Sequence, residues 1–192
     1  LRLKSYRSRT TRLLTNTQMR SNWMHQLGVQ SGDQAESILD DLLWKPELGI
    51  MGGAGDDLDV LTPNREASLS RAILNEWAAK SIAEEVVETD RDREIADQVL
   101  LGFELPLSDE EALSVLSRWI SLFTSQDFDE SSEEVQRLNT LYLELGGGSS
   151  ADQGDQAEAL SFTLEALLQH PRRGGFRFSN PQLPAADEYR HL

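Results

Sequence analysis

Apolar residues recur every three to four positions along most of this 192-residue chain. The spacing matches the 3.6 residues of a helical turn and predicts amphipathic helices that bury one face. The clearest case lies between positions 108 and 123, where one face carries Leu113, Leu116, Trp119, Ile120 and Phe123. No stretch shows the apolar–polar alternation of a half-buried strand. The pattern therefore predicts an all-α fold.

Capping signals mark where several of these helices begin. Ser108 and Glu111 have the spacing of a capping box, in which each side chain bonds the other residue's backbone N–H. The same spacing recurs at Thr15 with Gln18 and at Ser131 with Glu134. We predict helices over residues 15–27, 34–44, 63–87, 90–101, 108–123, 131–145 and 156–169. They form an irregular bundle of six to seven helices with an ordered Gly/Asp-rich loop over 49–64.

Composition divides the chain into three parts. We predict a basic N-terminal arm over residues 1–14, a helical domain over 15–170, and an irregular tail over 171–192, which is rich in Gly and Pro. Inside the helical domain, a sub-boundary is possible near 88–107. The run of Gly and Ser at 146–155 predicts a flexible linker.

The net charge of −15 is unevenly distributed. Residues 1–32 hold six bases and no acid, whereas residues 33–170 hold 31 acids and eight bases. The acidic segment 33–170 is expected to repel nucleic acid, because phosphate binding needs a broad cationic surface. The candidate partner-binding residues are Arg2, Lys4, Arg7, Arg9 and Arg12. They suit an acidic partner or the acidic body of the same chain; the alternative is a solvated, loosely ordered terminus.

Few residues suggest chemistry. Cys is absent, which excludes disulfides, thiolate metal sites and covalent haem attachment in this chain. His25, His170 and His191 are scattered, without the spacing of a metalloprotease helix. The sequence contains no run of about 18 apolar residues, so no membrane span is predicted. No catalytic residue is predicted.

A calcium site is the one metal hypothesis that the residues suggest. Asp56, Asp57 and Asp59 cluster in the Gly-rich loop, and hard cations bind clustered carboxylate and carbonyl oxygens. The loop lacks the EF-hand spacing, so solvated or helix-capping carboxylates are the alternative. The four Trp lie on apolar helical faces and are predicted to anchor the core; they are Trp23, Trp44, Trp77 and Trp119.

Three segments resemble, in order, parts of one family. They are residues 12–28 (RLLTNTQMRSNWMHQLG), 105–111 (LPLSDEE) and 164–172 (LEALLQHPR). The family is the large multidomain proteins of planctomycetes and myxobacteria with cytochrome-associated domains of unknown function, here their first two helical modules. Met19 stands where the family typically has Tyr, and residues 173–178 replace its usual aromatic ending. The resemblance covers residues 12–178.

That resemblance implies a helical accessory segment of a longer exported protein, periplasmic or extracellular, sometimes coupled to haem modules elsewhere. Because the chain begins with Leu1, we also expect it to be a piece of a longer product. The favoured function is a non-catalytic interaction or scaffold module without a cofactor, whose arm and tail bind a protein partner or other domains of the same chain. One alternative is an accessory component of a cytochrome-linked redox system, with non-covalent haem on His25, His170 or Met. Another is a calcium-stabilised domain.

Overall fold

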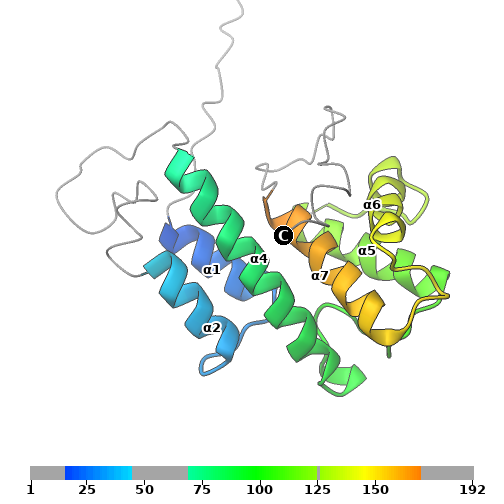
Figure 1. Ribbon diagram of the computed structural model, residues 1–192, viewed down its shortest axis with the longest axis horizontal. Helices are drawn as coiled ribbons and strands as arrows, with labels where there is room; N and C mark the ends of the chain where they lie inside the picture. The colour runs from blue at the N-terminus through cyan, green and yellow to red at the C-terminus, as the bar shows by residue number, and fades with distance from the viewer. Residues whose placement is uncertain (1–15, 45–68, 125, 170–192) are drawn as a thin grey trace, which may run out of the picture.

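The computed structural model of the protein describes residues 16–44, 69–124 and 126–169. This part of the chain contains six α-helices and no strand, which confirms the predicted all-α bundle. Figure 1 shows α4 crossing the molecule, with α1 and α2 on one side and α5, α6 and α7 on the other. The elements are α1 (Asn16–Gln26), α2 (Gln34–Leu39), the π-helical turn η1 (Asp40–Trp44), α4 (Leu69–Arg91), the 3₁₀ turn η2 (Ile95–Asp97), α5 (Asp109–Thr124), α6 (Glu133–Glu144) and α7 (Gln153–Gln169).

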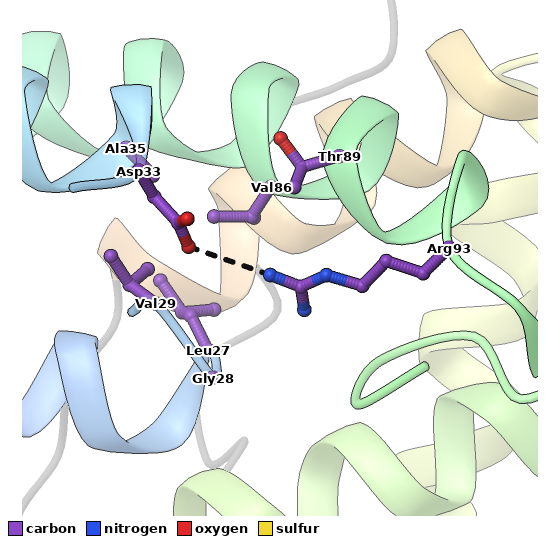
Figure 2. Close-up of a pocket in the computed structure, with 8 residues that line it drawn as sticks. All are labelled: Leu27, Gly28, Val29, Asp33, Ala35, Val86, Thr89 and Arg93. Atoms are coloured by element: carbon purple, nitrogen blue, oxygen red, sulfur yellow. Dashed lines mark hydrogen bonds and ion pairs between the residues drawn. The ribbon is translucent and has the colours of Figure 1, made fainter. Parts of the chain in front are cut away.

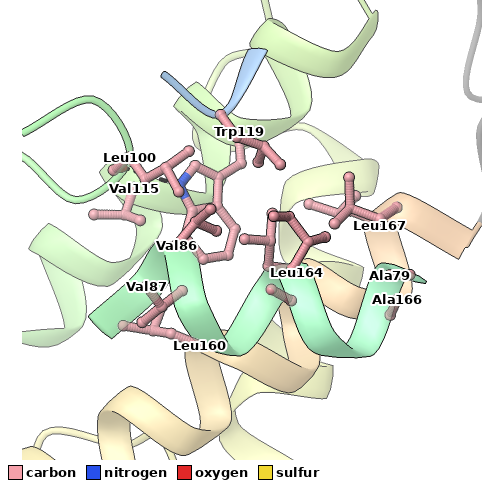
Figure 3. Close-up of a cluster of buried hydrophobic side chains, with 14 of the residues drawn as sticks. Ala79, Val86, Val87, Leu100, Val115, Trp119, Leu160, Leu164, Ala166 and Leu167 are labelled. Atoms are coloured by element: carbon pink, nitrogen blue, oxygen red, sulfur yellow. Dashed lines mark hydrogen bonds between the residues drawn. The ribbon is translucent and has the colours of Figure 1, made fainter. Parts of the chain in front are cut away.

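The core is one cluster of buried side chains that extends from Met19 to Leu168. The α4 and α7 helices form its centre, and Figure 3 shows Val87 of α4 beside Leu160 of α7. Trp119 of α5 is fully buried, and its indole N–H donates to the Leu100 carbonyl at 2.9 Å. The polar end of this large side chain is thereby satisfied inside an apolar environment.

The predicted capping box at the start of α5 is confirmed. The Ser108 N–H donates to the Glu111 carboxylate (2.8 Å), and the Glu111 N–H donates to the Ser108 hydroxyl (3.3 Å). The bonds that the Ser108 N–H and the Ser108 hydroxyl donate to the Glu111 carboxylate lower the pKa of Glu111, because they favour its charged form. The capping box predicted at Ser131 and Glu134 is wrong by one residue. Ser132 accepts the Val135 N–H and caps α6.

The predicted helix over 90–101 is wrong. After α4 ends at Arg91, only the short turn η2 is helical before α5. The buried carboxylate of Asp90 accepts the backbone N–H groups of Val99 (2.8 Å), Leu100 (2.9 Å) and Leu101 (2.8 Å). Those three groups bond a side chain on α4 instead of carbonyls one turn earlier, so the segment folds back along α4. Periodic apolar residues alone do not reveal this competition.

The first two helices agree with the predicted spans where the structure describes them. Gly28, with a φ of 65°, follows α1 as predicted, and Val99 lies directly against it. The second span, 34–44, contains both α2 and η1. Asp33 precedes α2 without bonding it as a cap; its carboxylate instead accepts the Gln30 N–H at 2.8 Å. Thr15 and Pro63, the other predicted starts, lie outside the described residues.

The predicted flexible linker over 146–155 needs correction. Gly146, with a φ of 95°, closes α6 in a left-handed conformation, and the Gly147 N–H donates to the Tyr142 carbonyl at 2.9 Å. The first helix residue of α7 is already Gln153. A segment rich in Gly and Ser is typical of a chain without a fixed conformation. In the structure, the glycines instead allow a tight turn that other residues could not adopt.

Gln156, a fully buried side chain of α7, ties this turn to the segment before α5. Its oxygen accepts the Leu107 N–H (2.6 Å), and its amide nitrogen donates to the carbonyls of Leu107 and Gly148 (both 3.1 Å). One buried side chain thus bonds three backbone groups, among them both the N–H and the carbonyl of Leu107. The start of α7 is therefore held against both neighbouring loops.

Tyr142 gives a first stability prediction. The side chain is 1% exposed, and its hydroxyl has no hydrogen-bond partner among the described residues. Burial, and the charge of Asp109, raise the pKa of this hydroxyl, so it stays protonated and polar. Because Tyr142→Phe removes an unpaired buried polar group, we expect it to increase the free energy of unfolding by about 1 kcal/mol in a denaturant titration. A comparable decrease would instead show that the hydroxyl has a partner.

Candidate functional site

The outward face of α4 exposes two large apolar side chains one helical turn apart. Ile73 is 38% exposed and Trp77 is 56% exposed. The α7 helix packs along one side of α4, and α2 packs along another. Helical spacing places Glu84 and Glu88, both exposed, on the same outward line as these two residues. Grouped apolar side chains on a surface are typical of interaction sites.

The prediction that all four Trp anchor the core is wrong for Trp77. Trp23 and Trp119 are buried as predicted, and the side chain of Trp44 lies outside the described ones. Trp77 does fall on an apolar stripe of α4, but no described helix covers that stripe. Helical periodicity indicates which residues share a face, and only tertiary packing decides whether a neighbour covers it.

Beside α4, α7 carries a buried carboxyl group. Glu165 is 5% exposed, and its carboxylate accepts the Gln169 side-chain N–H at 2.7 Å. Desolvation raises the pKa of Glu165 to about 7, and the charge of Glu76 on α4 adds to that rise. Lys80, also on α4, acts in the opposite direction. These two neighbours show that the end of α7 lies beside the first turns of α4.

The surface formed by Ile73 and Trp77 is therefore exposed and aromatic. Acidic side chains surround it, and the titratable carboxyl of Glu165 lies nearby on α7. A carboxyl with a pKa of about 7 has a proton affinity suited to general acid–base catalysis. Glu165, however, is bonded to Gln169 and is not among the residues that line the pocket described next. The exposed groups are two apolar side chains, three carboxylates (Glu76, Glu84 and Glu88) and one base, Lys80, so the surface is anionic on balance. Such a surface suits binding of a segment that carries both cationic and apolar side chains.

A separate small pocket lies between α4 and the turn that joins α1 to α2. Figure 2 shows the ion pair across it, with the Arg93 guanidinium 3.4 Å from the Asp33 carboxylate. The cavity volume is about 10 Å³, which is room for about one water molecule. Sites for small molecules have volumes of hundreds of cubic ångströms. This pocket therefore suits a bound water and not a substrate or cofactor.

The residues predicted as sites lie outside the described part of the chain. These are the arm residues Arg2, Lys4, Arg7, Arg9 and Arg12 and the calcium candidates Asp56, Asp57 and Asp59. Within the described ranges, no group of three or more His, Asp or Glu side chains has a geometry that could hold a metal ion. Of the haem-ligand candidates, His25 is exposed on α1, Met19 is buried in the core, and His170 is not described.

Sequence reasoning missed the Ile73–Trp77 surface and the buried Glu165. A signal for Glu165 was present, because α7 is apolar nearly all round. Buried residues occupy both sides of it, at Leu164 and Ala166 as well as at Leu160 and Leu168. A helix of this kind is enclosed by neighbours, so a charged residue in its middle is expected to be buried.

None of the helices in the described ranges combines the length and the apolar character that a membrane crossing requires. Comparison of the chain with protein-family models, with curated proteins and with solved structures finds no match in any of the three. The family resemblance over residues 12–178 therefore stays a prediction, and the candidate site is argued from its own residues.

Proposed function

We propose that the protein is a non-catalytic helical interaction module, and that the outward face of α4 around Ile73 and Trp77 is its contact surface. The observation that supports this is the 56% exposure of Trp77 beside a second exposed apolar residue. Trp is enriched among the residues that dominate binding energy, because its large side chain loses much water contact when a partner covers it.

Charge around the two apolar residues favours a cationic partner segment. Glu76, Glu84 and Glu88 are exposed on α4, and the exposed Lys80 is the one base among them. Complementary charges at the edge of an interface speed association and select among partners. The partner is thus expected to present basic side chains next to an apolar or aromatic residue.

The test places a photoreactive residue, p-benzoylphenylalanine, at position 77 of the full chain in the cells that produce it. We expect a cross-linked adduct of one discrete mass. The matched control is position 143 on α6, where the native Leu143 is also exposed, at 47%, and where we expect no such adduct.

Binding of the cross-linked protein is then measured with purified components. We expect Ile73→Asp and Trp77→Asp each to raise Kd at least about tenfold, with the free energy of unfolding changed by less than about 0.5 kcal/mol. Leu143→Asp should leave Kd unchanged. Equal Kd values for all three variants and the native chain would contradict the proposal.

A further inference from the structure

The chain that follows α7 begins close to the exposed surface of α4. The two helices run antiparallel, since Glu165, late in α7, lies beside Glu76 and Lys80, early in α4 (Figure 1). The last residue of α7, Gln169, is one helical turn beyond Glu165. A rise of about 1.5 Å per residue carries it about 6 Å further toward the N-terminal end of α4, where Ile73 lies in the second turn.

The residues directly after this point match the surface in chemistry. Positions 172–178 read Arg-Arg-Gly-Gly-Phe-Arg-Phe, with three bases, two aromatic residues and no acid. Arginine is attracted both to carboxylates and to the face of an indole ring. Phe176 and Phe178 can cover apolar area on Ile73 and Trp77. An extended chain of seven residues spans up to about 25 Å. This reach exceeds the distance of about one helical turn between the end of α7 and the Ile73–Trp77 surface.

The basic N-terminal arm is the competing segment of the same chain. It enters the described structure at Asn16 on α1, a helix that packs mainly against η1, whereas α7 packs directly along α4. Residues 1–14 contain one aromatic residue, Tyr6, whereas 172–178 contain two. Both position and composition therefore favour the C-terminal segment.

We propose that residues 172–178 dock on the surface formed by Ile73, Glu76 and Trp77, and so act as an internal competitor of the partner. The docking step stands on its own, and its regulatory consequence rests on the proposed function. A partner that needs the same surface must displace the segment, so its apparent affinity falls with the fraction of chains in which the segment is docked.

The test uses the full purified chain with p-benzoylphenylalanine at position 77, irradiated at low protein concentration. We expect a cross-link within one chain to a peptide that contains residues 172–178. The double variant Phe176→Ser, Phe178→Ser should lower the yield of that cross-link about tenfold, because two aromatic contacts are lost. Position 143 on α6 is again the matched control and should give no cross-link to this peptide.

Cross-links from position 77 to residues 1–14, to residues 45–68 or to a second copy of the chain would overturn the proposal, as would no cross-link at all. The two proposals fail in different ways. A cross-link to 172–178 without any partner adduct in cells leaves the docking intact and contradicts the contact surface. A partner adduct whose Kd is the same in the double variant and the native chain contradicts the competition alone.

Discussion

Asp90→Ala is expected to lower the free energy of unfolding by about 3–5 kcal/mol. The carboxylate is 1% exposed and accepts three backbone N–H groups, from Val99, Leu100 and Leu101. Alanine leaves the buried N–H groups of Leu100 and Leu101 without partners, and each unpaired donor costs about 1–3 kcal/mol before the structure relaxes. The partly buried guanidinium of Arg93, which lies 3.4 Å from the Asp90 carboxylate, also loses a partner. Denaturant titration followed by circular dichroism measures the loss.

The matched control is Asp97→Ala, which makes the same chemical change at an exposed position in η2. We expect its effect to stay within about 0.5 kcal/mol. Asp90→Asn should fall between the two, because an amide keeps one acceptor oxygen but replaces the other with a donor that faces backbone N–H groups. If Asp90→Ala were as stable as Asp97→Ala, the segment from 98 to 101 would be held by its apolar contacts and not by the carboxylate.

Glu165→Gln is expected to stabilise the protein at pH 8 by about 3 kcal/mol and to leave its stability unchanged near pH 4. Burial raises the pKa of Glu165 from 4.5 to about 7 in the folded chain. Between these values the unfolded chain releases a proton that the folded chain keeps, so this group makes the fold less stable as the pH rises. Below pH 4.5 both states are protonated, and above about pH 7 the loss is complete. Each pKa unit corresponds to about 1.4 kcal/mol.

The measurement is the difference in unfolding free energy between the variant and the native chain, determined by denaturant titration from pH 4 to pH 8. Using the difference cancels the contributions of other acids, such as Glu36, whose pKa is lowered by the Gly32 N–H. Glu158→Gln, at an exposed position of the same helix, is the matched control and should change the free energy of unfolding by less than about 0.5 kcal/mol. A Glu165→Gln difference that stays constant with pH would show that this carboxyl is ionised in the fold at neutral pH.

Much of the fold was predictable because its determinants are local. The apolar period between positions 108 and 123 depends only on residues within one helix, and the Ser108–Glu111 box depends on residues three apart. The structure confirms both, and it confirms the all-α class. The same local reasoning was wrong where a distant group intervened. Asp90 takes the N–H groups of residues 99–101, and no helical pattern within that segment indicates it.

The candidate site was less predictable than the fold. The residues expected to bind partners or calcium lie outside the described part of the chain, so those hypotheses stay predictions. The surface that the structure does describe was predicted as core, because Trp77 shares the spacing of buried residues. A large exposed aromatic side chain and a buried one have the same sequence signature.

By itself, the sequence determined that this chain forms amphipathic helices, where α5 begins, and how its charge is divided between a basic arm, an acidic body and a basic tail. These properties follow from residues close together in the chain. Only the tertiary structure decided that none of the described helices covers the outward face of α4 at Trp77, and that burial raises the pKa of Glu165. Exposure and pKa depend on which other helices lie nearby, and that is a property of the whole packed molecule.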